Sequence, residues 1–376
     1  MSEMVRLGDV VNVSASNLHL PDEDIWLLNL DMVEQQTGNI IDYNYGSKEK
    51  LNGSIIQFDT ENVLYSKLRP NLNKVVIPKM NGYATSEMLP LRPNMDFITK
   101  EYLCAYLRSD SFVTWAVSKT SGAKMPRLGT KELLSKTIPL PPLPEQRRIA
   151  AVLDKVSELI ALRKRQLDLL DEMVKARFVE MFGDPVRNEK SYPIKHLSDV
   201  AEYWNGLTYK PEDISEKGII VLRSSNIQNF KLDYSDIVRV SCKISQKKYV
   251  QANDILMCSR NGSAKLVGKV ALIDNINEPM SFGAFMMIIR SNLYSYLHTY
   301  FQLPAFRLQI TTGATTTINQ ITTNMLNKIV LPIPNEESIS QFADFVQQVE
   351  KSKATVQQAL EKLELLKSAL MQAYFG

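Results

Sequence analysis

The feature that most constrains this sequence is an internal repeat, in which one pattern occurs twice, 193 residues apart (Gly183 against Gly376). Residues Leu167–Gly183 read LDLLDEMVKARFVEMFG, and residues Leu360–Gly376 read LEKLELLKSALMQAYFG. The same offset aligns Ile138–Pro141 (IPLP) with Leu331–Pro334 (LPIP). A register that holds through a proline-rich entry and the segment after it indicates two copies of one structural plan.

The first part of each copy predicts an α+β fold. Helical patterns occur at Glu101–Arg108 and Lys131–Ser135. Short β-branched or aromatic runs, bounded by Asn, Gly and Pro, indicate strands and turns. These runs are Ser54–Phe58, Lys74–Ile77, Val267–Ile273 and Met286–Ile289.

The second part of each copy predicts a long helix. Pro144 suits the first turn of a helix, and neither Gly nor Pro follows before Gly183, so about 40 residues can form a helix of about 60 Å. Apolar residues recur there at three- and four-residue steps, at Ile149, Leu153, Val156, Ile160, Leu167, Leu170, Val174 and Met181. The second copy continues the pattern with Phe342, Val346, Val349, Val356, Leu360, Leu363, Leu370 and Tyr374. The series is interrupted by Arg163, Arg177, Lys353 and Lys367.

Such an apolar seam must be covered by a second helix. The simplest partner for each helix is the other one, and an antiparallel pairing is easiest because a globular domain lies between them in the sequence. The alternative is that each helix packs back on its own domain. A 60 Å helix is too long for that, since a domain of about 140 residues has a radius of gyration of about 14 Å.

Composition narrows the class of protein. The 376 residues suffice for two or three domains, and apolar residues make up 44% of them, enough for each domain to bury a core. Lys and Arg number 44 against 41 Asp and Glu, a balance that permits a nucleic-acid partner without requiring one. The three cysteines lack metal-site spacing. We expect a cytoplasmic protein without a signal peptide or a membrane span.

Signatures of catalysis are missing from the sequence. There is no HExxH and no GxSxG, and no Asp or Glu has Lys two positions after it, as a common nuclease arrangement requires. The segment Gly262–Val270 resembles a phosphate-binding loop but has five residues between its glycines instead of four. We therefore expect binding rather than catalysis, with no catalytic residue and no metal site in this chain.

Polar loops after the predicted strands carry the chemistry of duplex DNA binding. Lys neutralises phosphates, Ser and Thr bind phosphate oxygens, Arg can bond guanine O6 and N7, and Asn can bond adenine N6 and N7. Any single loop could be an ordinary solvated turn, but these clusters recur at matching places in both copies with different side chains. The candidate DNA-contacting residues are Lys67, Arg69, Asn71, Asn73, Lys124 and Arg127 in the first half and Arg223, Asn226, Arg260, Asn261, Ser263, Lys265, Thr315, Thr316 and Asn319 in the second.

Together these features resemble the specificity subunits of type I restriction–modification enzymes, over essentially the whole chain. The most specific part is Ile138–Ala150 (IPLPPLPEQRRIA), which resembles the entry into the first conserved helix of that family. Asn62–Pro70, Ser86-Glu87, Val221–Asn226 and Asn253–Leu256 add support. The second entry, Pro334–Ser338 (PNEES), departs from the motif.

The resemblance implies two target-recognition domains, 1–141 and 184–333, separated and joined by conserved helices at 142–183 and 334–376 that form an antiparallel coiled coil with pseudo-two-fold symmetry. Each domain would read half of a bipartite, asymmetric DNA site. Two methyltransferase subunits would dock on the helices, and restriction subunits would join through them. The chain itself would hold no cofactor, because S-adenosylmethionine, ATP and Mg would be bound by the partner subunits.

Two alternatives remain open. One is a stand-alone DNA-binding regulator, and the other is a coiled-coil interaction protein without DNA affinity. A scaffold needs a second apolar stripe on its helices, whereas a stand-alone binder does not. Residues off the seam that could form such a stripe, or could instead cap the ends of the helix pair, are Leu159, Leu169, Met173 and Phe178.

Overall fold

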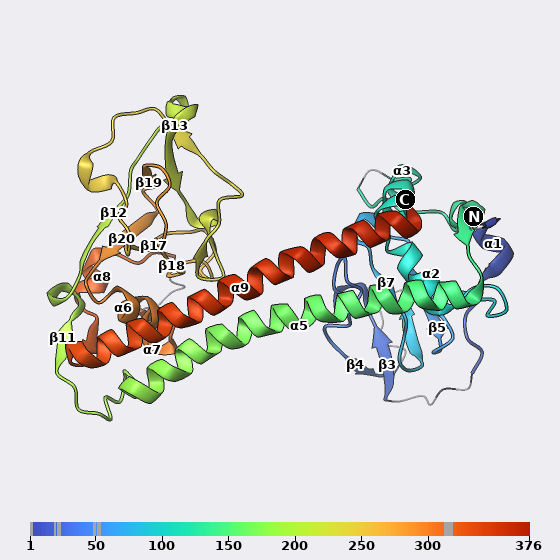
Figure 1. The fold of residues 1–376 in the computed structure, drawn as a ribbon, viewed down its shortest axis with the longest axis horizontal. Helices are drawn as coiled ribbons and strands as arrows, with labels where there is room; N and C mark the ends of the chain where they lie inside the picture. Colours follow the sequence, from blue (N-terminus) through green and yellow to red (C-terminus); the bar gives the residue numbers. More distant parts are fainter. Residues whose placement is uncertain are drawn as a thin grey trace. The chain divides into compact units, whose positions relative to one another are not determined.

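The computed structural model describes residues 3–18, 20, 24–47, 50, 54–122, 124–311 and 319–376. The chain forms two compact units (Figure 1). The first unit is Met1–Lys164 together with Gln357–Gly376, and the second unit is Arg165–Val356. Each unit therefore contains one globular part and segments of both long helices, α5 (Leu143–Phe182) and α9 (Glu336–Phe375).

The first unit has mixed α and β structure. Its short helices are α1 (Leu7–Val10), α2 (Lys100–Leu107), α3 (Asp110–Ser118) and α4 (Thr130–Ser135). Its strands are β1 (Glu3–Arg6), β2 (Val11–Val13), β3 (Ile25–Leu28), β4 (Asn44–Gly46), β5 (Ile55–Phe58), β6 (Val63–Ser66), β7 (Val75–Val76), β8 (Gly82–Thr85), β9 (Met88–Pro93) and β10 (Thr137–Leu140). They form sheets with the orders β4-β3-β8-β5, β2-β9-β6-β7 and β1-β10.

The second unit repeats this organisation. Its short helices are α6 (Tyr294–Tyr300), α7 (Pro304–Thr311) and α8 (Thr323–Asn327). Its strands are β11 (Ile194–His196), β12 (Glu202–Asn205), β13 (Ile214–Leu222), β14 (Ile227–Gln228), β15 (Lys231–Leu232), β16 (Arg239–Val240), β17 (Ile255–Cys258), β18 (Val270–Leu272), β19 (Met280–Phe282), β20 (Met286–Arg290) and β21 (Val330–Pro332). They form sheets with the orders β16-β13-β19, β12-β20-β17-β18, β11-β21 and β14-β15.

The two units match in their main elements, although the sheet β4-β3-β8-β5 has four strands and its counterpart β16-β13-β19 has three. In the first unit β3 pairs in parallel with β8, and in the second β13 pairs in parallel with β19. The helices α5 and α9 begin and end 193 residues apart, at Leu143 and Glu336 and at Phe182 and Phe375. The expected α+β repeat with two long helices is thereby confirmed.

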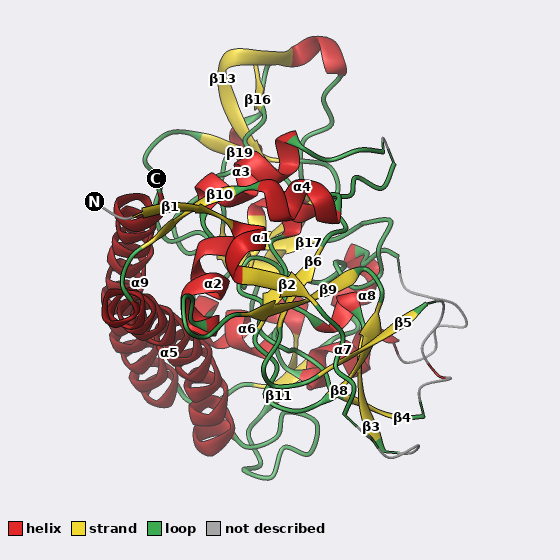
Figure 2. Ribbon diagram, turned by 90° about the vertical axis from the view of Figure 1, so that its right-hand side faces the viewer, coloured by secondary structure: helices red, strands yellow, loops and turns green. Residues whose placement is uncertain are grey.

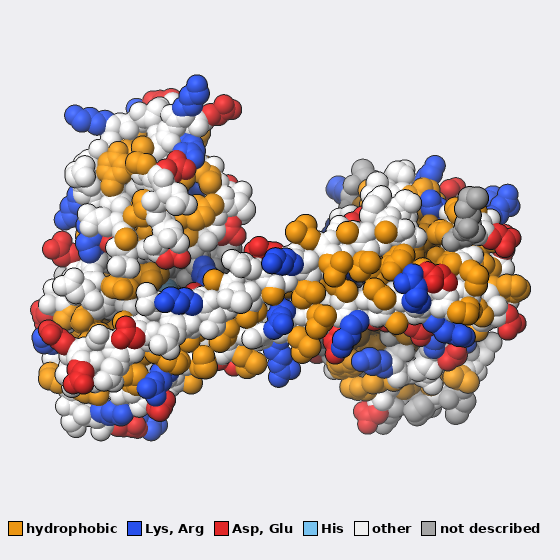
Figure 3. All heavy atoms as spheres, in the orientation of Figure 1, with side chains coloured by type: hydrophobic (Ala, Val, Ile, Leu, Met, Phe, Trp, Pro, Cys, Tyr) orange, Lys and Arg blue, Asp and Glu red, His pale blue; other side chains and the backbone are white. Residues whose placement is uncertain are grey.

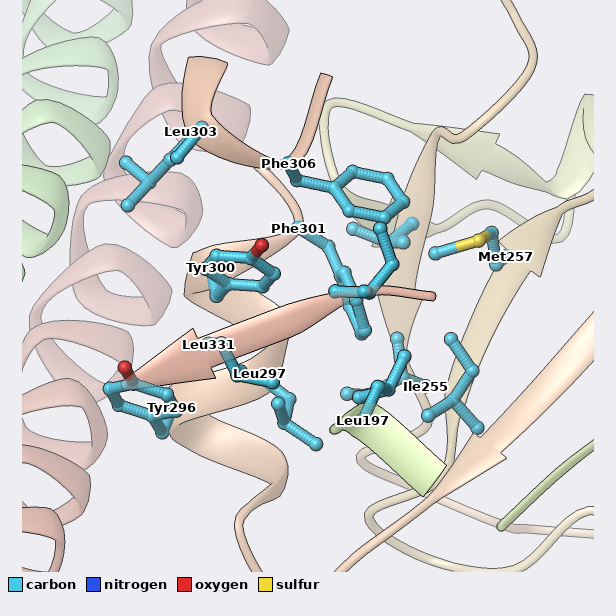
Figure 4. Close-up of a cluster of buried hydrophobic side chains, with 14 of the residues drawn as sticks. Leu197, Ile255, Met257, Tyr296, Leu297, Tyr300, Phe301, Leu303, Phe306 and Leu331 are labelled. Carbon is cyan, nitrogen blue, oxygen red and sulfur yellow. The ribbon is translucent and has the colours of Figure 1, made fainter. Parts of the chain in front are cut away.

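Each unit completes its core with residues from both long helices. In the second unit Phe178 and Phe182 of α5 pack with Phe342 of α9 and with Tyr296. Figure 4 shows the neighbouring part of this core, where Tyr296 and Tyr300 lie beside Leu331. In the first unit the corresponding core contains Ile149, Leu153, Tyr102, Tyr106 and Phe375.

The long helices also pair with each other, in an antiparallel sense. In the first unit the beginning of α5 lies beside the end of α9, as the Lys164–Glu364 ion pair shows at 3.2 Å. In the second unit the end of α5 lies beside the beginning of α9, since Phe178 packs on Phe342. Figure 2 shows the two long helices side by side. All the residues predicted to form the seam are buried or half-buried. Both interpretations of the helices therefore apply, because the helix ends pack on the globular parts and the apolar seams face each other.

One of the residues predicted off the seam is placed differently. Phe178 is fully buried in the core of the second unit, so of its two expected roles it does not take the one in an outer apolar stripe. Leu169 and Met173 are exposed by 52% and 42%. Figure 3 shows hydrophobic side chains along the surface of the helices, and those exposed on α5 and α9 are Leu162, Leu169, Met173, Val179, Leu365 and Leu366.

In the Pro-Glu-Gln motif, the side chain of Gln146 forms hydrogen bonds to the backbone of neighbouring segments. This side chain is fully buried; its Oε1 accepts a hydrogen bond from the Thr99 N–H at 2.9 Å, and its Nε2 donates to the carbonyls of Phe97 at 2.7 Å and Pro141 at 2.8 Å. Gln146 thus joins the first turn of α5 to the loop that enters α2. The corresponding residue in the second copy is Ile339, which is buried and apolar.

Lys353 is a cation buried in the seam of the second unit. It forms ion pairs with Asp171 of α5 and, at 2.8 Å, with Glu350 of α9. Burial alone would lower the pKa of Lys353, but the two carboxylates outweigh it and hold this pKa above its ordinary value. Burial would raise the pKa of Glu350, but hydrogen bonding to Lys353 holds it below its ordinary value.

We predict that Gln146→Ala lowers the free energy of unfolding by about 2–4 kcal/mol, because it leaves two buried backbone groups, the Thr99 N–H and the Pro141 carbonyl, and the partly buried Phe97 carbonyl without this partner. Thermal and denaturant unfolding of the full chain would measure this. Gln341→Ala, at an exposed position of α9, is the matched control and should change stability by less than about 0.5 kcal/mol. Equal effects of the two substitutions would contradict the role given to Gln146.

We predict that Lys353→Ala destabilises the protein by about 1–2 kcal/mol at pH 7, because Asp171 and Glu350 lose a shared cation, while both carboxylates remain partly hydrated and Glu350 keeps Lys231 at 3.1 Å. The ion pairs stabilise the fold above the ordinary pKa of Glu350, 4.5, and below that of Lys353, 10.5. The difference from the wild type should therefore shrink as the pH falls below about 4.5, where the lowered pKa of Glu350 is approached. Lys351→Ala, at an exposed position two residues away, should show neither effect.

Candidate nucleic-acid interface

The first candidate loop of the first unit follows β6 and is a compact loop. Ser66 N–H donates to the Lys74 carbonyl at 3.0 Å and closes it. Arg69 and Asn73 have positive φ angles of 49° and 50°, a conformation that Asn tolerates better than most residues. The side chains of Arg69 and Asn71 are exposed, and that of Lys67 is half-buried.

A second loop, residues 121–128, lies against the first. The Arg69 N–H donates to the Pro126 carbonyl at 2.8 Å, and the Leu128 N–H donates to the Lys67 carbonyl at 2.9 Å. Lys124 is exposed on this loop. The structure thus brings Lys67, Arg69, Lys124 and Arg127, which are distant in the sequence, onto one pair of loops.

Arg127 is held by a carboxylate. Its Nε and Nη2 donate to Glu87 at 3.1–3.2 Å, and about 43% of its side chain is exposed. The hydrogen bonds to Glu87 raise the pKa of Arg127, so it stays charged. Its positive charge is partly neutralised by this neighbour.

The second unit has a corresponding pair of loops. Residues 259–265 follow β17, and the Ile321 N–H donates to the Ser259 carbonyl at 2.7 Å. The Asn261 N–H donates to the Asn319 carbonyl at 3.3 Å. Arg260 and Asn319 are exposed. Thr315 and Thr316, also predicted on the second of these loops, lie outside the described residues.

A third segment, Arg223–Asn226, joins the pair in the second unit. Asn261 Nδ2 donates to the Ser224 hydroxyl at 3.1 Å, and Asn261 Oδ1 accepts from the Ser263 N–H at 2.9 Å. Ser263 and Lys265 are exposed, whereas Asn261 is half-buried. Arg223 forms an ion pair with Asp236 at 2.8 Å and keeps about a third of its side chain exposed.

The two buried asparagines differ from the prediction that their side chains contact DNA. Asn226 is 1% exposed, and its amide accepts from the Arg223 N–H and donates to the carbonyls of Asp233 and Asp236 at 2.8–2.9 Å. Asn73 is 6% exposed and donates to the Arg108 carbonyl at 3.0 Å. Both asparagines hold loops in place, because their side chains bond to backbone inside the protein.

The loop pairs occupy equivalent places in the two units. Leu128 and Ile321, which make the matching backbone hydrogen bonds, are 193 residues apart, and so are Arg127 and Gln320. Bridges between the loops join Leu68 to Arg127 and Arg260 to Gln320. The backbone frame is therefore shared, while the side chains that it presents differ.

Sequence reasoning did not place two contacting residues in the interface: Glu87 and Phe285. Glu87 and Phe285 each precede the central strand of a sheet, β9 or β20, and touch an arginine of the loop pair. For Glu87 the sequence offers one signal, which is the position of Ser86-Glu87 in a turn between two strand-like runs. Phe285 offered no such signal, because its contact with Arg260 depends on long-range strand pairing.

The described residues contain no group of three or more His, Cys, Asp or Glu side chains arranged to hold a metal ion. Among the helices in the described part of the chain, none is long and apolar enough to cross a membrane.

Two solved structures share this fold. One is described as "Structural basis underlying complex assembly and conformational transition of the type I R-M system"; it has a TM-score of 0.61 at 19% identity and covers 100% of this chain and 97% of that chain. The other is described as "Crystal structure of Type-I restriction-modification system S subunit from M. genitalium"; it has a TM-score of 0.59 at 12% identity, with coverage of 100% and 96%. At these identities the likeness concerns the fold alone.

Curated relatives are specificity subunits of type I restriction enzymes. The MjaVIII specificity subunit of Methanocaldococcus jannaschii is 23% identical over 329 residues, which cover 80% of this chain and 75% of that protein. The EcoKI specificity subunit of Escherichia coli K12 is 24% identical, with coverage of 76% and 67%. The EcoDI specificity subunit of Escherichia coli is 30% identical over 129 residues, so the match spans only 28% of that relative's length.

The family model described as the type I restriction modification DNA specificity domain matches this chain twice, at residues 2–172 and 189–365. The two matches together cover most of the chain, one in each copy of the repeat. The paired polar loops, the repeated fold and these matches agree, and the chain belongs to the family of type I restriction–modification DNA specificity subunits.

Proposed function

We propose that each unit reads one half of a bipartite DNA site and that the chain carries no chemistry of its own. The recognition domains are residues 1–141 and 184–333, and the helical segments 142–183 and 334–376 form the spacer between them. The observation that carries this proposal is the pair of loops built on the same backbone frame in both units with different polar side chains. Two related domains that recognise different DNA sequences must present different side chains on these loops.

The candidate residues of the loop pairs divide into two kinds of contact. Lysine side chains neutralise phosphates without reading sequence, whereas arginine can form two hydrogen bonds with guanine. We assign phosphate contacts to Lys67, Lys124 and Lys265 and base contacts to Arg69 and Arg260. Asn71, Ser263, Asn319, Thr315 and Thr316 complete the proposed surface, together with the partly exposed Arg127, Arg223 and Asn261.

Adenine methylation and ATP-dependent cleavage are assigned to partner subunits. Those partners would bind S-adenosylmethionine, ATP and Mg, and the chain would hold none of them. The exposed apolar side chains on α5 and α9, such as Leu169 and Leu365, support a docking surface for two methyltransferase subunits, through which restriction subunits join. A stand-alone DNA-binding regulator would not need that surface, and co-purification of a methyltransferase with this chain distinguishes the two.

We predict that Arg260→Ala or Arg69→Ala, each in the full chain, weakens binding and relaxes the preference at one base position by about 1–3 kcal/mol, because a guanine contact is lost. Selection from a randomised duplex library would measure the preference. Arg187→Ala, at an exposed residue beyond the end of α5, is the control and should leave it unchanged. If affinity instead falls equally for all sequences, the arginine contacts phosphate.

We predict that a seven-residue insertion between Arg163 and Leu167, with a matching insertion between Val356 and Leu360, lengthens the DNA spacer by about 3 bp. Seven helical residues add about 10.5 Å, and B-DNA rises about 3.4 Å per base pair. The two half-sites are expected about one helical turn apart, near 34 Å. Sequencing of methylated sites in cells carrying the variant measures the spacer, and an unchanged spacer contradicts the role of the helices.

A four-residue insertion at the same places is the matched control. Because it breaks the seven-residue repeat of the seam, it should reduce stability and activity instead of producing a new spacer.

A further inference from the structure

The turn that precedes the central strand lies directly beneath the recognition loops in both units. In the first unit Glu87 is the last residue before β9, and its carbonyl accepts a hydrogen bond from the Lys67 N–H at 3.0 Å. In the second unit Phe285 is the last residue before β20, and its carbonyl accepts from the N–H groups of Ser259 at 2.9 Å and Arg260 at 3.1 Å. The Ser259 hydroxyl donates to the same carbonyl at 2.9 Å.

The side chain of this turn residue contacts an arginine in each unit. Glu87 binds the guanidinium of Arg127 through both of its oxygens. Phe285 lies under the guanidinium of Arg260, with 5.3 Å between the guanidinium carbon and the ring centroid. The two arginines come from different loops of the pair. Arg127 occupies the position that Gln320 takes in the second unit, and Arg260 occupies the position that Leu68 takes in the first.

Exposure distinguishes these contacts from ordinary packing. Phe285 is 58% exposed although its backbone is fixed by three hydrogen bonds. A large ring held rigidly at the surface restricts a flexible arginine to one plane and leaves the guanidinium edge free to donate. Glu87, with 25% of its side chain exposed, instead occupies part of the donor edge of Arg127 and partly neutralises its charge.

From this arrangement we propose that Glu87 and Phe285 are positioning residues that determine how each unit presents its arginine to DNA. Phe285 orients Arg260 for a directional contact with a base edge, the kind of contact that discriminates guanine. Glu87 prevents Arg127 from acting as a general phosphate contact and keeps it in one orientation. The proposal deepens the DNA-reading function and rests on it.

For Phe285 the test is a selection of preferred sequences from a randomised duplex library, using the full chain with the methyltransferase of its system. Phe285→Leu removes the aromatic face, and we expect discrimination to fall roughly two- to fivefold, only in the half-site affected by Arg260→Ala. Phe285→Tyr keeps the aromatic face and should retain the preference. In an Arg260→Ala background, Phe285→Leu should have no further effect.

A matched control exists in the same unit. Phe230 is 36% exposed and has the Lys175 ammonium 5.1 Å from its ring, away from the loop pair. Phe230→Leu should leave both half-site preferences unchanged. The positioning role of Phe285 is overturned if Phe285→Leu has no effect, weakens all sequences equally, or still acts when Arg260 is absent.

For Glu87 the test is the salt dependence of binding to DNA that lacks the preferred site. Glu87→Gln removes the charge that neutralises Arg127 at nearly constant size, so non-specific affinity should rise and the slope of log K against log salt should steepen by up to about 0.9, one phosphate contact. Glu61→Gln, at a carboxylate that pairs with Lys100, is the control. An unchanged slope overturns the role of Glu87.

The wild-type protein separates failure of this proposal from failure of the proposed function. If the wild type selects no bipartite sequence, both are wrong. If it selects one and the Phe285 and Glu87 variants behave as their controls do, the DNA-reading function stands and the positioning role is rejected.

Discussion

The rest of the structure depends on burial of the apolar seam between α5 and α9. Neither unit closes its core without both helices: Phe375, the last residue of α9, packs among the aromatic residues of the first unit, and Phe182, the last residue of α5, packs in the second. The Ser111 hydroxyl also donates to the Phe375 carbonyl at 2.7 Å. The core of the first unit is thus completed by the end of α9, so α2 and α3 pack against a segment far away in the sequence.

The charged residues within the apolar seam fix its register. An apolar seam of two similar helices can slide by a turn at little cost, and a polar residue at a single seam position is the best-attested way to fix a register. Here each seam cation corresponds, at the 193-residue offset, to an apolar residue in the other copy. The corresponding pairs are Lys353 with Ile160, Lys367 with Val174, Arg163 with Val356 and Arg177 with Leu370. Lys353 is satisfied by Asp171 across the seam, and a slipped register would bury it without that carboxylate.

The sequence predicts the long-range organisation better than the site. Periodicity and the repeat offset predict the paired helices, because apolar spacing follows directly from helix geometry. They do not predict that Phe178 is buried, since the end of a helix enters a core that depends on tertiary contacts. The misplaced asparagines, Asn73 and Asn226, show a second limit: residue type alone does not tell whether an amide bonds to DNA or to the protein's own backbone. Phe285 shows a third, because its contact with Arg260 arises only from pairing of β17 with β20.

The shared loop frame explains how one fold can present different chemistry in its two halves. The frame is made by backbone hydrogen bonds, such as Leu128 to Lys67 and Ile321 to Ser259, which do not depend on the side chains that face outward. At the other end of the same strands, each unit keeps a buried carboxylate paired with an arginine, Asp59 with Arg92 at 2.6 Å and Asp254 with Arg290 at 2.7 Å. Because stability resides in these buried and backbone interactions, a change of exposed loop residues alters what is read at small cost to the fold. Glu87 and Phe285 serve both stability and recognition. Their carbonyls accept hydrogen bonds from the loop backbone, and their side chains contact the arginines that we propose to face DNA.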